Sequence, residues 1–297
     1  FPYTTLFRSY KFLIVLATLI WGSSFVIVKD TTDAVSPAWI LVVRFGLATL
    51  ILALVYLKKR ELYFRKDYIA LGALFGFLLF MGYYLQTIGI TDTTPGKNAF
   101  LTGTYCVMVP FFAWGISKRR PHAFNIVAAF MCVIGIGLVS LGSGFSMSFG
   151  DLLTLCCAVF YGLHICFVSK FSQDRDIYVL TMWQFFFVTI FSLCSGGIFE
   201  QPPHWETLSW DTWASLLYLG IACTALALLF QNIGQQKLPP STASLLLSLE
   251  SPFGVAFSVA FGAEVLTGRM VCGFVLIFAA ILVSELAPGL LAKRKEK

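Results

Sequence analysis

Three ionisable side chains stand alone within long apolar stretches of the sequence: Arg44, His164 and Glu250. A charged group at membrane depth is costly unless it has a partner, so each of them is a candidate functional residue. Arg44 could attract a carboxylate, and His164 or Glu250 could take up a proton or a cation. The structural alternatives are that Arg44 binds a carbonyl or reaches the membrane interface, and that the other two hydrogen-bond a neighbouring helix. Both interpretations stay open.

Polar and aromatic side chains recur at helical spacing in three further places, so the members of each set share one helix face. The sets are Asn98, Thr102 and Tyr105; Trp21, Ser24 and Phe25; and Tyr161 with His164. Such a face lines a cavity, or it packs and hydrogen-bonds between helices. Aromatic walls with few polar groups suit amphipathic or aromatic ligands. The predicted cavity lining is completed by Tyr84, Gln231 and Ser248, although Gln86 and Gln231 could equally gate or cap helix ends.

The sequence lacks the common motifs of catalysis and metal binding. None of its three histidines, His122, His164 and His204, has HExxH spacing, and there is no GxSxG elbow, Walker loop or paired-cysteine pattern. All eight cysteines fall inside apolar stretches, where thiols behave as small hydrophobic groups. We therefore expect no catalytic residue, no cofactor, no metal site and no disulfide.

The composition indicates which solvent surrounds these residues. Of the 297 residues, 58% are hydrophobic and only 12% are charged, whereas soluble domains carry about 25% charged residues. This leaves too little polar surface to cover a water-soluble globule, so lipid must surround much of the chain. Hydrophobic runs of spanning length predict ten transmembrane helices. Their expected ranges are 11–28, 37–57, 68–89, 96–116, 122–141, 150–170, 177–198, 211–234, 240–262 and 268–290.

Proline and aspartate mark helix starts and kinks. A proline at a helix start loses no hydrogen bond, and a carboxylate there suits the exposed amides. The residues expected at helix starts are Pro37, Pro95, Pro240, Asp151 and Asp211. Pro110 and Pro252 lie inside two predicted helices at near-equivalent positions, so we expect kinks there, near a binding region.

Lysine and arginine divide unequally between the predicted loops. Three lie on one side of the membrane, namely Lys29, Lys97 and Arg269. Sixteen lie on the other: Lys11, Lys58, Lys59, Arg60, Arg65, Lys66, Lys118, Arg119, Arg120, Lys170, Arg175, Lys237, Lys293, Arg294, Lys295 and Lys297. Cytoplasmic loops are rich in these residues, so we expect both termini in the cytoplasm and the protein in the bacterial inner membrane. The net charge of +6 then reflects orientation rather than a nucleic-acid partner.

The chain is similar to itself when it is shifted by 140 to 145 positions. The matches are Trp21-Gly22 with Tyr161-Gly162, Arg44-Phe45 with Gln184-Phe185, Gln86 with Gln231, and Leu138-Val139-Ser140 with Leu282-Val283-Ser284. Each half holds five predicted helices, an odd number, so the second half must enter the membrane in the opposite sense. Inverted repeats are typical of secondary transporters, because two similar halves can exchange inward-facing and outward-facing shapes. Since Gln184 is uncharged, the structural interpretation of its counterpart Arg44 is favoured.

The first nine residues, FPYTTLFRS, resemble the translation of a sequencing adapter. We therefore treat residues 1–9 as a non-native segment, expect it to be poorly ordered or to extend the first helix, and leave it out of the fold prediction. The expected organisation is a first five-helix repeat at 10–142, an inverted second repeat at 150–290 and a basic cytoplasmic tail at 291–297.

Several short motifs follow one another across essentially the whole chain after residue 10. They are Trp21-Gly22-Ser23-Ser24-Phe25, Arg44-Phe45, the segment Thr94 to Thr102 with Pro110, the segment Ser244 to Pro252, and Gly262-Ala263-Glu264. In type and order they resemble the EamA-type permeases of the drug/metabolite transporter superfamily. The resemblance implies ten helices in an inverted repeat and a central cavity lined mainly by helices 1, 3, 4, 6, 8 and 9. It also implies export or exchange of amino acids and other small metabolites.

We therefore expect a secondary or facilitative transporter that moves a small metabolite, such as an amino acid or a related amphipathic compound, by alternating access. No nucleotide-binding motif points to ATP-driven transport. An intramembrane enzyme and a receptor or scaffold are the alternatives. The expected partners are a small-molecule substrate and the lipid bilayer, without nucleic acid, in a monomer or a homodimer.

Overall fold

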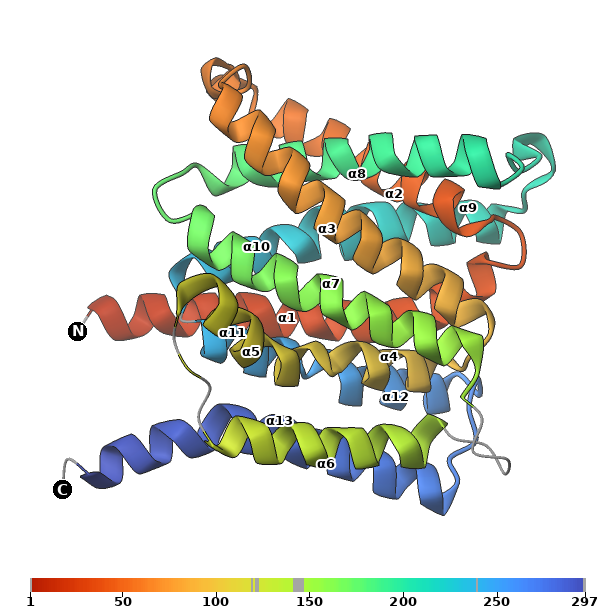
Figure 1. The fold of residues 1–297 in the computed structure, drawn as a ribbon. Helices are drawn as coiled ribbons and strands as arrows, with labels where there is room; N and C mark the ends of the chain where they lie inside the picture. Colours follow the sequence, from red (N-terminus) through yellow and green to blue (C-terminus); the bar gives the residue numbers. More distant parts are fainter. Residues whose placement is uncertain (1, 119, 121–122, 141–146, 239, 296–297) are drawn as a thin grey trace.

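Long helices joined by short connections make up the computed structural model, which describes residues 2–118, 120, 123–140, 147–238 and 240–295 (Figure 1). In chain order the elements are α1 (Pro2–Thr31), α2 (Pro37–Val55), η1 (Leu57–Leu62), α3 (Lys66–Thr91), α4 (Pro95–Gly103), α5 (Tyr105–Ser117), α6 (Ala123–Ser140), α7 (Phe149–Phe171), α8 (Ile177–Phe199), η2 (Trp205–Thr207), α9 (Trp210–Tyr218), η3 (Leu219–Leu226), α10 (Ala227–Lys237), α11 (Pro240–Leu247), α12 (Glu250–Ala260) and α13 (Gly268–Lys295). The amino-terminal segment extends the first helix, because α1 already begins at Pro2.

Ten membrane crossings account for these elements. Eight stretches of the described chain are long and apolar enough to span a bilayer, and two shorter apolar helices lie at Ala123–Val139 and Gly268–Val283. Together they fall, in order, on the ten ranges predicted from hydrophobic runs. The prediction of an all-helical membrane protein with ten spanning helices is confirmed.

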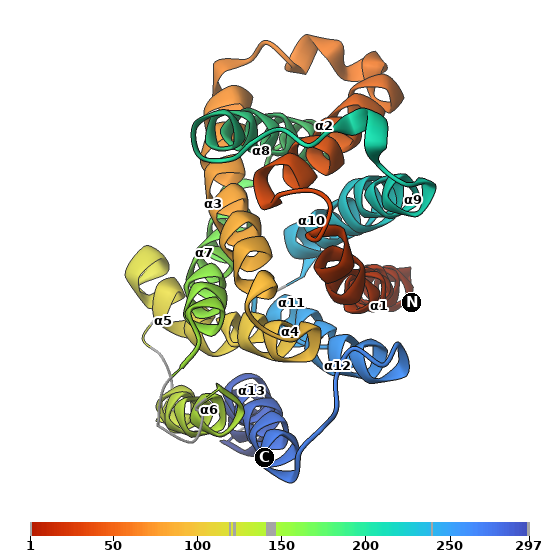
Figure 2. The same cartoon turned by 90° about the vertical axis from the view of Figure 1, so that its right-hand side faces the viewer.

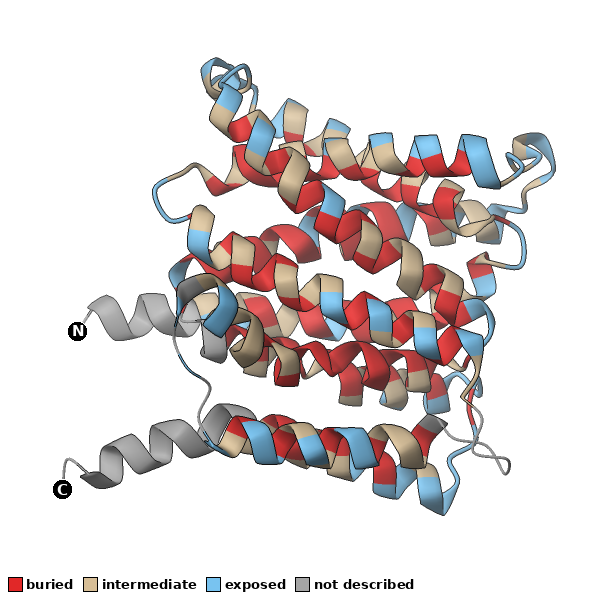
Figure 3. Cartoon of the chain, viewed as in Figure 1, coloured by how far each residue is buried: buried red, intermediate tan, exposed pale blue. Residues whose placement is uncertain are grey.

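Large apolar residues occur at exposed positions of the bundle as well as in its interior; Figure 3 colours the exposed positions pale blue and the buried ones red. Leu50 and Leu54 of α2, Phe130 and Val133 of α6, and Val275 of α13 are all exposed. In water such surface would drive association. In a bilayer, lipid tails solvate it at no cost, while the helices satisfy their own backbone hydrogen bonds.

The predicted helix starts are confirmed at the described positions. Pro37 and Pro95 occupy the first turns of α2 and α4. The hydroxyl of Ser148 accepts the amide N–H of Asp151 at the start of α7, and Ser209 does the same for the helix that contains Asp211. α11 begins at Pro240, and residue 239 lies outside the described residues.

Two spanning helices are interrupted at corresponding points. The fourth divides into α4 and α5 at Thr104, and the ninth divides into α11 and α12 at Ser248 and Leu249, 144 positions later. Proline cannot donate to the residue four positions before it and its ring crowds that carbonyl. Pro252 therefore disturbs Ser248 itself, whose carbonyl instead accepts the Ser251 N–H at 3.1 Å. Pro252 thus lies next to the break in its helix, whereas Pro110 lies inside α5, six residues after Thr104.

The eighth spanning helix carries a further irregularity that hydrophobic runs did not predict. Between α9 and α10 the chain forms the π-helical segment η3, in which hydrogen bonds join residues five positions apart instead of four. The Thr224 hydroxyl donates to the Leu219 carbonyl five positions earlier, at 2.7 Å. The repeat offset is 144 at the pair Gly76 and Gly220 but 145 at Gln86 and Gln231, so η3 lies where the second half gains one residue.

The two halves pack in the same pattern. α3 packs against α7 and α8, and its counterpart, built from η3 and α10, packs against α1 and α2. Glycines reproduce the pattern residue by residue: Gly76 of α3 lies against the backbone of Gln184 in α8, and Gly220 of η3 lies against that of Arg44 in α2. Gly76 and Gly220 are 144 positions apart, and Arg44 and Gln184 are 140 positions apart. The two contacts are therefore equivalent in the two repeats.

The repeats run in opposite senses. In Figure 1 α1 leads away from the end of the bundle where both termini lie, whereas its counterpart α7 leads toward that end. α6 and its counterpart α13 lie side by side at the edge of the bundle (Figure 2). Ion pairs of Lys59 with Asp176 and of Arg175 with Asp67 join the basic connections that share the end with the termini. We call this the basic end, and the other the opposite end.

Candidate functional site

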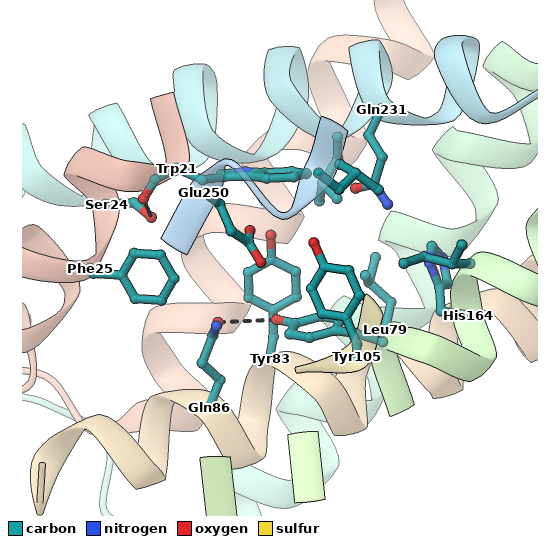
Figure 4. Close-up of a pocket in the computed structure, with 14 residues that line it drawn as sticks. Trp21, Ser24, Phe25, Leu79, Tyr83, Gln86, Tyr105, His164, Gln231 and Glu250 are labelled. Carbon is teal, nitrogen blue, oxygen red and sulfur yellow. Dashed lines mark hydrogen bonds between the residues drawn. The ribbon is translucent and has the colours of Figure 1, made fainter. Parts of the chain in front are cut away.

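A cavity lies between the two halves (Figure 4). Its lining residues are Trp21, Ser24, Phe25, Leu79, Tyr83, Gln86, Tyr105, Tyr161, His164, Ile165, Leu228, Gln231, Leu247 and Glu250. The space among them is at most about 480 Å³, so it suits a small molecule. The lining residues come from helices 1, 3, 4, 6, 8 and 9 of the ten, the set that the family resemblance implied. We call this space the central cavity.

Both interrupted helices meet the central cavity at their breaks. Tyr105 is the first residue of α5, directly after Thr104, and Leu247 and Glu250 flank the break between α11 and α12. Irregular backbone within a membrane is tolerated only where protein buries it or a cavity lies beside it. The breaks therefore bring side chains at helix ends into the cavity.

The structure brings most of the predicted site residues together. Those that line the central cavity are Trp21, Ser24, Phe25, Tyr105, Tyr161, His164, Gln231 and Glu250. Four others bond elsewhere. Tyr84 donates to Glu200 at 3.2 Å, and Asn98 donates to Thr154 at 2.8 Å. Thr102 accepts from Gln86 at 3.0 Å, and Ser248 donates to its own helix at Leu245.

Glu250 is the acidic side chain of the cavity lining. It is the first residue of α12, where the exposed amides of a helix start favour a negative charge. Its side chain is 6% exposed, and its carboxyl group faces the hydroxyl groups of Tyr83 and Tyr105 (Figure 4). Among the described residues, Oε1 of Glu250 has no hydrogen-bond partner.

Arg44 lies behind the cavity wall rather than in it. Its guanidinium carbon is 4.7 Å from the centre of the Tyr83 ring, and its Nε donates to the Thr224 hydroxyl at 2.9 Å. The side chain is 2% exposed, and Nη2 has no partner within the described chain. Thr224 belongs to η3, so the π-helical segment supplies the partner of this buried cation. This contact resembles the structural alternative in which Arg44 binds a carbonyl, but the partner is a hydroxyl group.

His164 reaches the cavity from α7 while one ring nitrogen is bonded away from it. Its Nε2 lies 3.2 Å from Oε1 of Gln184, the repeat counterpart of Arg44. The ring also packs edge to face against Phe75 at 6.2 Å. These contacts match the alternative in which His164 hydrogen-bonds a neighbouring helix.

The two repeat-related glutamines differ in their surroundings. Gln86 accepts from the Tyr161 hydroxyl and donates to Thr102, both at 3.0 Å, so its amide is held on two sides. Gln231 also lines the cavity, and its side chain makes no hydrogen bond to another described residue. Trp21, the counterpart of Tyr161, instead donates to the Cys223 carbonyl of η3 at 2.8 Å. The cavity is therefore built from equivalent positions that carry different polar contacts.

Sequence reasoning missed several lining residues, of which Tyr83 matters most. Leu79, Tyr83 and Gln86 stand at i, i+4 and i+7, so they share one face of α3, and all three line the cavity. The prediction named Tyr84 instead, which lies about 100° further round the helix. Extending the helical spacing back from Gln86 would have found Tyr83. Ile165, Leu228 and Leu247 are ordinary apolar residues that no sequence signal distinguishes.

Polar contacts join the halves at the opposite end of the bundle. Lys97 of α4 forms an ion pair with Asp151 of α7, with 2.9 Å between Nζ and Oδ2, although the geometry is not that of a hydrogen bond. Asp151 is fully buried and also accepts from Thr93 at 2.6 Å. Glu264, after α12, accepts from Thr94 at the start of α4. We call these contacts the opposite-end latch.

The chemistry of the central cavity is that of binding. Its polar groups are one carboxyl group, two amides, a serine hydroxyl, three phenols, an indole and an imidazole. Within the described chain no group of three or more His, Cys, Asp or Glu side chains could hold a metal ion. Aromatic rings and a few polar groups around a small space are the properties of a ligand site.

Comparisons with known proteins identify a family of membrane transporters. The model of the EamA-like transporter family matches the chain twice, at residues 8–141 and 148–286. An uncharacterized transporter of Archaeoglobus fulgidus is 33% identical over 271 residues, which are 91% of this chain and 84% of that protein. The uncharacterized transporter YoaV of Bacillus subtilis is 22% identical over 277 residues, 91% of this chain and 94% of that protein.

A solved crystal structure shows the same fold. It superposes with a TM-score of 0.71 at 17% sequence identity, and the match covers 98% of this chain and 99% of the other. At that identity the likeness concerns the fold alone.

Proposed function

The chain belongs to the EamA-like transporter family, a membrane transporter family of the drug/metabolite transporter superfamily, and from that premise we propose that it is a secondary or facilitative carrier. The proposed cargo is a small metabolite, an amino acid or a related amphipathic compound, which is exported or exchanged. The site is the central cavity, and the mechanism is alternating access between the two repeats.

One observation carries this proposal. The central cavity lies between two halves of opposite sense, and the two helices broken at corresponding positions, Thr104 and Ser248, meet it at their breaks. Rocking one half against the other around such a site would expose it to each side in turn. An enzyme would not need this arrangement, and membership in a transporter family excludes that alternative.

The orientation belongs to the same proposal. The basic connections and both termini share one end of the bundle (Figure 1), and Lys and Arg mark cytoplasmic loops. We place that end in the cytoplasm of a bacterial cell, with the chain in the inner membrane. The repeats are taken as residues 10–142 and 150–290, and 291–297 as a cytoplasmic tail. Lipid and a small substrate are the proposed partners, in a monomer or a homodimer.

Transport in proteoliposomes tests the proposal. The purified chain is reconstituted, and uptake and efflux of an amino-acid and small-metabolite panel are measured with and without a proton gradient. We expect saturable flux of at least one compound above empty liposomes. No flux for any compound in either direction would count against a carrier.

A matched pair of variants tests whether the central cavity is the route. Leu228→Trp fills the cavity, whereas Leu226→Trp, two residues earlier, places the same side chain at a position that is 42% exposed. We expect Leu228→Trp to abolish the flux and Leu226→Trp to retain it, with both proteins monodisperse in detergent. Equal flux through the two variants would place the route elsewhere.

A further inference from the structure

One oxygen of the Glu250 carboxyl group lies unpaired in the central cavity among the described residues. The side chain is 94% buried, lines the cavity, and leaves Oε1 without a hydrogen-bond partner or an ion pair among the described residues. A buried acceptor without a partner costs free energy, and a buried carboxylate without a cation costs more. A ligand that brings a hydrogen-bond donor and a positive charge would remove both costs.

The walls around this carboxyl group favour a positive ligand. Trp21, Phe25, Tyr83 and Tyr105 present aromatic rings to the cavity (Figure 4), and Tyr161 also lines it. The face of an aromatic ring carries partial negative charge and attracts a cation within about 6 Å of its centre. A carboxylate enclosed by aromatic rings is therefore complementary to an ammonium group on an apolar body.

The same lining offers little to a negative ligand. Among the residues that the structure describes, no Lys or Arg side chain lines the central cavity. The nearby cation, Arg44, packs against the Tyr83 ring without lining the cavity, and its Nε donates to Thr224. A substrate carboxylate in the cavity would have only neutral donors, such as Gln231, and would face Glu250. The cavity thus distinguishes the two charged groups of an amino acid.

We propose that the central cavity recognises its substrate through one protonated amine, which Glu250 binds at Oε1 inside the aromatic walls. An ammonium N–H donates to Oε1 in a charge-assisted hydrogen bond, the strong class of such bonds. The substrate class is then monoamines with an apolar or aromatic body, and a carboxylate on that body is tolerated rather than required. This inference rests on the proposed function for its statement that the bound amine is also transported.

Matched ligands separate the two charged groups. One set is phenylalanine, phenethylamine and 3-phenylpropionate; a second is leucine, isoamylamine and 4-methylpentanoate. Within each set the body is constant, and the compounds carry both charged groups, the ammonium alone or the carboxylate alone. Binding to the purified full chain in detergent is measured by calorimetry. We expect the two ammonium-bearing members to bind within about threefold of each other and the acid to bind at least about tenfold more weakly.

Two variants link the binding to Glu250. Glu250→Gln keeps the shape of the side chain and removes its charge, whereas Glu206→Gln makes the same change in an exposed carboxylate outside the cavity. We expect Glu250→Gln to weaken amine binding at least about tenfold and Glu206→Gln to leave it unchanged. The inference is overturned if no amine binds, if an acid binds as well as its parent, or if Glu250→Gln binds amines as the unaltered chain does.

Flux separates this inference from the proposed function. Glu250-dependent amine binding without flux in proteoliposomes would uphold the amine site and contradict the carrier. Saturable flux of compounds that lack an amine would uphold the carrier and overturn the amine site.

Discussion

The ion pair in the opposite-end latch leads to a quantitative prediction about stability. Lys97→Met keeps the length of the side chain and removes its charge, so the Asp151 carboxylate, which is 0% exposed, loses the one cation paired with it among the described residues. Removing one partner of a buried ion pair costs about 3–5 kcal/mol. Because Lys97 is 18% exposed and water can partly replace it, we expect the lower limit, about 3 kcal/mol. The Thr93 hydrogen bond to Oδ1 remains.

A double-mutant cycle separates the ion pair from other effects of the substitution. Asp151→Asn removes the stranded charge, so the double variant should lose less stability than the sum of the single variants, by about 2 kcal/mol. The free energy of unfolding is measured by SDS titration of the purified protein in mixed micelles. A cost below about 1 kcal/mol for Lys97→Met, or additive single effects, would refute this account of the latch.

The same latch has an expected effect on conformation. It ties α4 of the first half to α7 of the second at the opposite end of the bundle, so Lys97→Met should favour conformers that are open at that end. In a background without the eight native cysteines, Ser24→Cys places a thiol in the cavity. We expect a membrane-impermeant thiol reagent applied from the opposite end to label it faster in the Lys97→Met variant. Unchanged labelling would show that the latch stabilises the fold without controlling access.

Three further predictions concern the helices around the cavity. Gly76→Ala should lower the free energy of unfolding by about 1–3 kcal/mol, because the new Cβ would lie 2.7 Å from the Cβ of Phe187. Gly115 has open space around it, so Gly115→Ala should be neutral or stabilising. Equal effects of the two substitutions would contradict the close packing of α3 on α8. Thr224→Val removes the partner of the Arg44 Nε and should lower the free energy of unfolding by about 1–3 kcal/mol, and a loss below about 0.5 kcal/mol would show that Arg44 finds another acceptor. Flux through Glu250→Gln should lose its response to an imposed pH gradient, and a retained response would remove Glu250 from coupling.

The bilayer explains why the spanning helices could be predicted from the sequence. Lipid requires each crossing to be a long apolar helix that satisfies its own backbone, so hydrophobic runs reveal position and order. Proline and the N-terminal caps then fix starts such as Pro95 and Asp151. The odd number of helices in each repeat dictated the opposite senses, and the glycine contacts of Gly76 and Gly220 occur at the offsets read from the sequence.

The cavity was harder to predict because it depends on rotation about each helix axis. Tyr83 and Tyr84 are neighbours of the same residue type, yet only Tyr83 lines the cavity, while Tyr84 bonds Glu200. In a protein with apolar residues on every face, hydrophobicity does not show which side faces inward. Asn98 shares the predicted face with Tyr105, but it lies before the break at Thr104 and is buried against α7. The break changes which residues share a face.

The π-helical segment η3 makes the two repeats unequal, so the two end states of the proposed alternating-access cycle differ in their contacts. If the halves were identical, the shape open to one compartment and the shape open to the other would be isoenergetic, and the empty protein would divide its time equally between them. Here one half offers the Cys223 carbonyl to Trp21 and the Thr224 hydroxyl to Arg44, while the equivalent of Trp21 bonds a glutamine side chain. Exchanging the roles of the halves must break unequal sets of bonds. If the protein works by the proposed alternating access, its unloaded form should therefore prefer one of the two shapes, and the contacts of η3 should contribute to that preference.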